Sequence, residues 1–120
     1  MSHVLLVEDD AWLADVEAGA LRSAGFDVRV APNALAAIDI IDSIQPDAIV
    51  LDVLLAGSTG FALLNELQSY SDTATIPVIL CTSIAEQLND VQLKQYGVHR
   101  ILDKTTMVPD DIVAAVRSAL

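Results

Sequence analysis

The sequence is poor in cysteine, aromatic residues and positive charge, and each shortage excludes some kinds of protein. Its single cysteine, Cys81, rules out an internal disulfide and any multi-cysteine metal site. Because Cys81 ends the apolar run "VILC", we interpret it as a buried, inert thiol. Six Lys and Arg against seventeen Asp and Glu give a formal net charge of −11. Such a surface repels nucleic-acid phosphates and anionic lipids, so neither is an expected partner.

The sequence also lacks the signals of export and membrane insertion. Its start, "MSHVLLVEDD", has no basic flank, and its apolar run is too short for a signal peptide. No later apolar run is long enough to cross a bilayer. We therefore expect a soluble, cytoplasmic protein. With 120 residues, 53% of them hydrophobic and only 4% aromatic, the chain suits one domain with an aliphatic core.

Short aliphatic runs alternate along the chain with longer segments of helical period. The first, third and fourth runs are apolar without alternation, as expected of strands covered on both faces. The second run alternates, with Asp27 and Arg29 between apolar residues, and is predicted to be an edge strand. The five predicted strands are residues 3–7, 26–30, 47–51, 77–81 and 100–103.

The segments between the strands carry the marks of helices. Asn33 and Ser83 are expected to cap helices, Gly25 and Gly97 to end them, and Pro109 to open the last one. Five alternating β and α segments predict an α/β fold, a doubly wound (βα)5 parallel sheet with helices on both faces. The residues expected to face the core are Leu13, Val16, Ala20, Leu21 and Ala24; Leu35, Ile38 and Ile41; Phe61, Leu64 and Leu67; Leu88 and Val91; and Ile112, Val113 and Val116.

Polar residues follow four of the five predicted strands. Ligands of such sheets bind beyond the carboxyl ends of the strands, so these side chains are expected to share one site. Asp10 is interpreted instead as the cap of the first helix. The residues at the strand ends are Glu8, Asp9 and Asp10 after the first, Asp52 after the third, Thr82 and Ser83 after the fourth, and Lys104 after the fifth.

Carboxylates that converge at one edge of a sheet repel each other. A pair ~4 Å apart costs about 4 kcal/mol at a surface-like dielectric. A divalent cation removes this repulsion, and ligands that are all oxygen favour Mg²⁺ over Zn²⁺. Because Mg²⁺ prefers a few carboxylates plus a phosphate oxygen, the pattern also predicts a phosphorylated state. Lys104 and the Thr82 hydroxyl are suitable donors to phosphoryl oxygens, and Asp52 is a candidate metal ligand and reacting group.

Four motifs along the chain can be compared with a known family. They are "LLVEDD" (5–10), "PDAIVLDVLLAGSTG" (46–60), "IPVILCTS" (76–83) and "DK" (103–104). Over nearly the whole chain they resemble the receiver domain of two-component response regulators, a CheY-like, flavodoxin-like fold. The resemblance implies the strand order 2-1-3-4-5. It also implies that residues 1–120 form a receiver domain with no output domain. Such a chain could be a stand-alone regulator or a receiver excised from a longer protein, and its end directly after the last predicted helix does not separate the two.

The resemblance assigns a role to each residue of the site. Asp52 would be the phosphoryl acceptor and form an acyl phosphate. Lys104 would pair with Asp52 at rest and with the phosphoryl group after transfer, while Thr82 would swing its hydroxyl onto that group. The implied Mg²⁺ ligands are Glu8, Asp9, Asp52 and the backbone carbonyl of Leu54.

The resemblance also implies partners. The phosphoryl donor would be a phosphohistidine on a sensor histidine kinase or a histidine phosphotransfer protein. The chain would catalyse only its own phosphorylation and dephosphorylation, so it would be a signalling switch and not an enzyme acting on other substrates. Its conformational change would signal to a downstream protein that the sequence does not name. A homodimer through the fourth and fifth helices is an open alternative.

The sequence departs from the family pattern at several positions. Ala56 and Thr105 replace two common prolines, and we expect a trans peptide bond before Thr105, or a cis bond held by its surroundings. Ile101 replaces the usual switch aromatic, so the readout surface is expected to differ. Leu54 and Ile84 occupy the positions that gate the attacking water, and their apolar side chains predict slow self-dephosphorylation.

Two other functions remain as alternatives. A phosphorylation-independent pseudo-receiver is favoured by Ile101, Ala56 and Thr105, but the complete set of strand-end residues argues against it. A haloacid-dehalogenase-type phosphohydrolase would need a second acid at Leu54 and a cap domain. Outside the site, Trp12 is expected to pack in the ordinary way, with a docking surface as the alternative. His3 and His99 have no partner at a metal-binding spacing and are assigned structural or surface roles.

Overall fold

Strands and helices alternate along the chain as the sequence predicts. The computed structural model describes residues 2–52, 60–83 and 94–120. The helix expected to follow Ser83 falls on residues 84–93, which lie outside this description. The described elements are β1 (His3–Val7), α1 (Ala11–Ser23), β2 (Asp27–Ala31), α2 (Ala34–Ile44), β3 (Ala48–Asp52), α3 (Gly60–Gln68), β4 (Val78–Thr82), β5 (Val98–Asp103) and α5 (Pro109–Ala119).

The five strands form one parallel sheet in the order β2-β1-β3-β4-β5. This confirms the predicted topology, and β2 is an edge strand as its alternating pattern indicates. In the register, Val7 lies opposite Leu51, and Asp52 lies opposite Cys81. All carboxyl ends of the strands therefore reach the same edge of the sheet.

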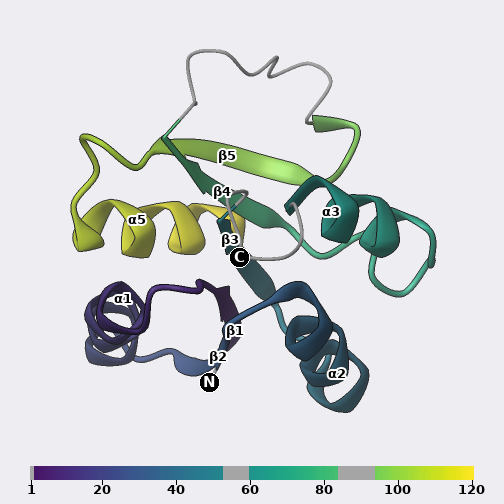
Figure 1. Ribbon diagram of the computed structural model, residues 1–120, viewed down its shortest axis with the longest axis horizontal. Coiled ribbons are helices and arrows are strands. Elements are labelled where there is room, and N and C mark those ends of the chain that lie inside the picture. The colour runs from purple at the N-terminus through teal and green to yellow at the C-terminus, as the bar shows by residue number, and fades with distance from the viewer. Residues whose placement is uncertain (1, 53–59, 84–93) are drawn as a thin grey trace.

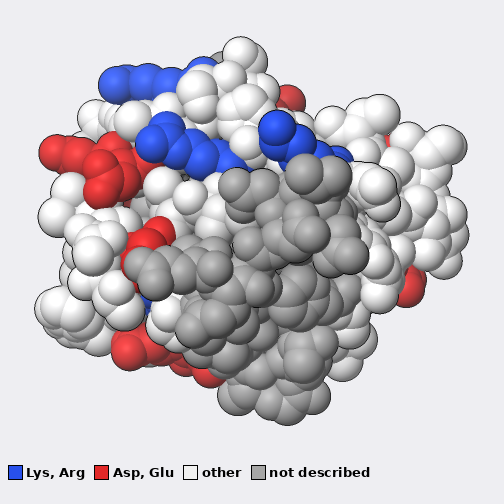
Figure 2. Space-filling view, turned by 90° about the horizontal axis from the view of Figure 1, so that it is seen from above, with Lys and Arg blue, Asp and Glu red and all other residues white. Residues whose placement is uncertain are grey.

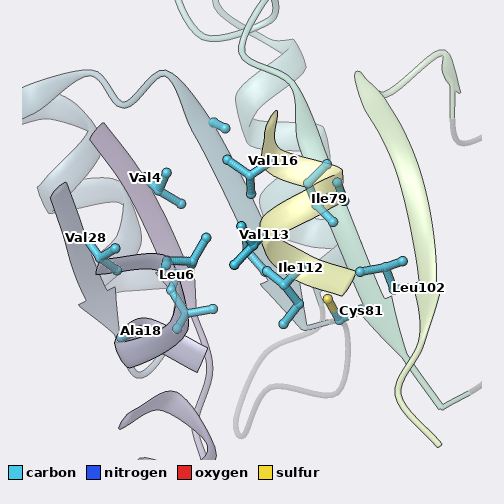
Figure 3. Packing of buried hydrophobic residues seen from close by; sticks show 14 of the residues in the cluster. Val4, Leu6, Ala18, Val28, Ile79, Cys81, Leu102, Ile112, Val113 and Val116 are labelled. Atoms are coloured by element: carbon cyan, nitrogen blue, oxygen red, sulfur yellow. The ribbon is translucent and has the colours of Figure 1, made fainter. Parts of the chain in front are cut away.

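Helices cover both faces of the sheet, and each face has its own core. Figure 1 shows α1 and α5 on one side of the strands and α2 and α3 on the other. Alternate residues of the central strands point to opposite sides, so Leu5 and Ile49 belong to the α2/α3 core and Val4 and Val50 to the α1/α5 core. Figure 3 shows the α1/α5 core, in which aliphatic side chains surround Cys81.

Local chemistry at the helix ends agrees with the sequence predictions. The Asp10 side chain accepts a hydrogen bond from the backbone N–H of Leu13 (3.1 Å), and Asn33 caps α2 in the same manner. Gly25 follows α1 with φ +99°, a conformation that glycine adopts at little cost. At the start of α5, Asp111 accepts from the N–H of Val108 (2.9 Å), and Pro109 is the first helical residue.

The predicted inner faces of α1 and α2 are partly wrong. Val16 is 36% exposed and Leu35 is 72% exposed, whereas Ala14, Glu17 and Ala18 are buried. Ala14 and Ala18 pack in the α1/α5 core, and the buried side of α1 also includes Glu17. The ordinary packing expected of Trp12 is also wrong, because this side chain is 73% exposed.

In α3 and α5, the described residues that were predicted to face the core are buried. Leu64 and Leu67 of α3 and the three expected residues of α5 are buried. The side chain of Phe61 lies outside the described part of the chain. None of the described helices is both long enough and apolar enough to cross a bilayer.

Candidate functional site

The carboxyl edge of the sheet brings the predicted site residues together. Glu8 follows β1, Asp52 ends β3, Thr82 ends β4 and Lys104 follows β5. Glu8 and Asp52 are each 3% exposed, and Thr82 is fully buried. Charged side chains are seldom buried to this extent unless they are paired or bind metal. The site is therefore a buried polar cluster in an otherwise aliphatic domain.

Lys104 joins the two buried carboxylates. Its Nζ donates to Glu8 Oε2 at 3.1 Å and to Glu8 Oε1 at 3.3 Å, and it also forms an ion pair with Asp52 Oδ2. The backbone N–H of Lys104 donates to the Thr82 carbonyl at 2.9 Å, which fixes the start of the β5–α5 loop against β4. The predicted pairing with Asp52 is present, and the pairing with Glu8 is an addition that the sequence did not indicate.

Three carboxylates at this edge could hold a metal ion. One oxygen each from Glu8, Asp9 and Asp52 lie within 4.8 Å of one another. Asp9 is exposed while the other two are buried, so the cluster opens to water on one side. A set of oxygen ligands with access to water fits a hard cation such as Mg²⁺, which retains several of its waters. The Leu54 carbonyl, the fourth ligand implied by the resemblance, lies outside the described residues.

The electrostatics of the cluster agree with its need for positive charge. Burial, followed by the nearby charge of Asp52, raises the pKa of Glu8 to about 7, although Lys104 acts in the opposite direction. Burial also disfavours the charged form of Lys104, but its hydrogen bonds to Asp52 and Glu8 outweigh this and raise its pKa. Among the described residues, Lys104 pairs with Glu8 and Asp52, and Asp9 adds a third carboxylate to the same edge, so a bound cation would offset repulsion there.

A third buried acid, Glu17, was missed in the sequence. It lies on α1 and is 2% exposed, and burial followed by the charge of Glu8 raises its pKa to about 7. Its i−3 neighbour Ala14 and i+4 neighbour Leu21 are buried, so the helical period does place Glu17 on the inner face. That signal was available, but an acidic residue is ordinarily assigned to the solvent side of a helix.

Some of the other predictions near the site are confirmed, and some concern residues outside the described part of the chain. The peptide bond before Thr105 is trans, as expected. Cys81 is buried, and burial raises its thiol pKa, in agreement with an inert side chain. Ile101 is half-buried and packs against the α2/α3 core. Ala56 and Ile84 lie outside the described residues, so the predictions that depend on them stay predictions.

The remaining surface charge is unevenly distributed. Figure 2 shows a face on which basic side chains gather along one border and acidic side chains lie towards the left and lower borders. Four of the six basic residues come from the last third of the sequence. Of the two histidines, His3 has its Nδ1 3.0 Å from Asp27 Oδ2, and His99 has its Nε2 3.2 Å from the Ser118 hydroxyl. Both are consistent with the surface roles expected of them.

Comparisons with known proteins agree with this geometry. The chain is 30% identical over 120 residues to RpaA, a DNA-binding dual master transcriptional regulator of Synechocystis sp., covering all of this chain and 49% of that protein. It is 32% identical to PhoB, the phosphate regulon transcriptional regulatory protein of Pseudomonas aeruginosa, covering 98% of this chain and 51% of that protein. The chain thus spans about half the length of the curated relatives it matches.

A solved structure shows the same fold. The chemotaxis response regulator CheY4 of Vibrio cholerae superimposes with a TM-score of 0.89 at 22% identity, covering 100% of this chain and 99% of that chain. The family model described as the response regulator receiver domain matches residues 4–117. Fold, strand-end residues and sequence similarity therefore agree: the chain belongs to the response regulator receiver domains, which act in phosphorylation-based two-component signalling.

Proposed function

We propose that Asp52 is the phosphoryl acceptor of this receiver domain and that the reaction depends on Mg²⁺. The observation that carries the proposal is the pairing of a carboxylate that is only 3% exposed with the ammonium group of Lys104, beside Glu8 and Asp9. An aspartate in this setting is held in place by the ammonium group, and its carboxylate can act as the nucleophile that forms an acyl phosphate.

Glu8, Asp9 and Asp52 would hold the metal ion, together with the backbone carbonyl of Leu54. Their oxygen atoms already lie within 4.8 Å of one another without a reorganisation of the sheet edge. When bound, Mg²⁺ supplies positive charge that offsets the repulsion among the carboxylates and the negative charge of a phosphoryl group.

The side chains around Asp52 have separate tasks in phosphoryl transfer. An Asp52 carboxylate oxygen attacks the phosphorus of a phosphohistidine, so that a P–O bond forms while the P–N bond breaks and the imidazole leaves. Lys104 holds Asp52 before transfer and follows the new negative charge onto the phosphoryl oxygens afterwards. Thr82, at the end of β4, donates its hydroxyl to the same group. The movement of Thr82 would alter the loop that follows β4 and signal the phosphorylated state.

The donor in this proposal is a sensor histidine kinase or a histidine phosphotransfer protein. Receiver domains of response regulators interact with histidine kinases, and this family membership supports such a partner. The relatives RpaA and PhoB are named as transcriptional regulators. For the chain itself, we propose that the output is a change in affinity for a downstream protein.

Incubation with acetyl phosphate, with and without Mg²⁺, followed by intact mass spectrometry tests the proposal. The expected result is one phosphoryl adduct that requires Mg²⁺ and is lost in Asp52→Asn. Asp39→Asn, which changes an exposed aspartate of α2, is the matched control and should retain the adduct. An adduct that survives in Asp52→Asn would refute the assigned acceptor. No adduct from either acetyl phosphate or a phosphohistidine donor would favour the pseudo-receiver instead.

A further inference from the structure

The β5–α5 loop, which carries Lys104, is closed by hydrogen bonds to Asp103. Asp103 is the last residue of β5, and its Oδ1 accepts from the N–H of Thr105 at 2.9 Å and from the Thr105 hydroxyl at 2.6 Å. Its backbone carbonyl accepts from the N–H of Met107 at 2.9 Å. An aspartate that accepts from the N–H two residues later forms an Asx turn, which fixes the backbone between the two residues. The residue inside this turn is Lys104.

The two peptide groups that flank Lys104 are both anchored. On one side the N–H of Lys104 donates to the Thr82 carbonyl at 2.9 Å, and on the other side the N–H of Thr105 donates to Asp103. Fixing both peptide planes sets the two soft backbone angles of Lys104, and these set the direction in which its side chain leaves the backbone. From there the ammonium group reaches the two buried carboxylates of the cluster.

Packing leaves open space on one side of Lys104. A pocket of about 310 Å³ is lined by Lys104 and Thr105 together with residues of α1 and α5, among them Leu13, Glu17 and Ile112. Lysine has a flexible four-carbon stem, and a pocket does not restrict the rotation of such a stem. The backbone turn is therefore needed to direct the ammonium group to the cluster.

Thr105 supplies both of the donors that the Asp103 carboxylate accepts. Proline, which is common in the family at this position, has neither an N–H nor a hydroxyl and could form neither bond. The bonds from the hydroxyl and then from the N–H of Thr105 lower the pKa of Asp103, so its carboxylate remains an ionised and strong acceptor near neutral pH. The two side chains thus form one unit.

We propose that Asp103 and Thr105 are positioning residues for phosphoryl transfer, and that the turn between them directs the Lys104 ammonium group to Asp52 and to the phosphoryl group that Asp52 receives. Neither residue belongs to the acceptor or to the proposed metal ligands, so both act through Lys104. This inference rests on the proposed function, in which Lys104 meets the phosphoryl oxygens.

The rate of phosphorylation by acetyl phosphate at saturating Mg²⁺ is the first test. Asp103→Ala removes the acceptor of the turn and should slow the reaction about tenfold or more, because a small misplacement of a reacting group is costly. Asp103→Asn keeps a carbonyl oxygen at the accepting position and should retain most of the wild-type rate. An unchanged rate in Asp103→Ala would overturn the proposal. So would equal losses in the two variants, since the charge of Asp103 and not the turn would then be responsible.

Thr105 gives a second comparison that does not depend on how well Asp103→Ala folds. Thr105→Val removes the hydroxyl at nearly constant shape and should slow the reaction, whereas Thr105→Ser should restore the rate. Thr106→Val is the matched control, because the Thr106 hydroxyl lies 3.5 Å from the Asp103 carbonyl, beyond the length of a good hydrogen bond. It should leave the rate unchanged. Equal rates in Thr105→Val and Thr105→Ser would refute the role of the hydroxyl.

The placement of Lys104 can also be measured without phosphorylation. The chain has only two lysines, so ¹³C-labelled lysine gives two Cε signals in an NMR spectrum, and exposed Lys94 serves as the reference. Without Mg²⁺ or a phosphoryl donor, the Lys104 signal should move towards that of Lys94 in Asp103→Ala and stay in place in Asp103→Asn. A Lys104 signal that does not move in Asp103→Ala would overturn the proposal. If wild type forms no adduct, the proposed function fails, while this signal still decides whether the turn positions Lys104.

Discussion

The buried carboxyl group of Glu17 should make the stability of the protein depend on pH in an unusual direction. Burial and the charge of Glu8 raise its pKa from 4.5 to about 7 in the folded state. The folded protein therefore binds the Glu17 proton more tightly than the unfolded chain does. Between pH 4.5 and about 7, the free energy of unfolding falls as pH rises, and outside this window Glu17 adds no slope.

The size of the effect follows from the two pKa values. The interval from 4.5 to about 7, at 1.36 kcal/mol for each pH unit, gives about 3 kcal/mol. Glu17→Gln keeps the size of the side chain but cannot ionise. The variant should match wild type near the lower end of the window and exceed its stability by up to about 3 kcal/mol above the upper end.

Urea denaturation of both proteins over a series of pH values, without Mg²⁺, measures this difference. Burial and the charge of Asp52 also raise the pKa of Glu8 to about 7. Because Glu8 and Glu17 repel each other, the difference between wild type and the variant measures Glu17 together with its interaction with Glu8. Glu66→Gln, at an exposed position, should give a curve parallel to wild type. The reasoning fails if the difference between Glu17→Gln and wild type is independent of pH, or if the variant is the less stable protein at about pH 8.

Three further changes test the site and the fold. Lys104→Met leaves the buried carboxylates Glu8 and Asp52 without their cation, so it should cost about 2 kcal/mol or more without metal, and Mg²⁺ should restore much of the lost Tm. An equal loss with and without Mg²⁺ would contradict a metal site there. Asp10→Ala removes the cap of α1 and should cost about 1 kcal/mol in urea denaturation, whereas Asp10→Asn should remain close to wild type. Gly97→Ala should cost about 1 kcal/mol or more in urea denaturation. The φ angle of Gly97 is +78°, which strains a residue with a side chain, and the added Cβ would lie 3.0 Å from Gln68 Nε2.

The strands and the site were predictable because their signals are local. Continuous aliphatic runs locate β1, β3 and β4 to within one residue, since a parallel strand buried on both faces tolerates little else. Residues that follow such strands must share one edge, which is why Asp52 and Lys104 could be placed together from sequence. The strand order could not be obtained in this way and came from the family resemblance.

The inner faces of the helices were harder to predict because they depend on tertiary packing. In α2 the sequence "ALAAIDIIDSI" is apolar at most positions, so its period does not decide between Leu35, which is exposed, and Ala37, which is buried. In α1 the choice depends on how closely the helix approaches the sheet. Small residues permit a close approach, and the approach then encloses Glu17. The helical period offers a signal for Glu17, but the packing is what shows that this acid is buried.

The carboxylate cluster and Glu17 differ in how far they are open to a hydrated ion. Asp9 is exposed, so an ion can reach the first group, Glu8, Asp9 and Asp52, while it keeps much of its hydration. Glu17 is enclosed by aliphatic walls, where a hydrated metal ion would lose its water without gaining enough ligands. Lys104 pairs with Glu8 and Asp52 and lines the same pocket as Glu17, so a change of charge at one place alters the electrostatic field at the other.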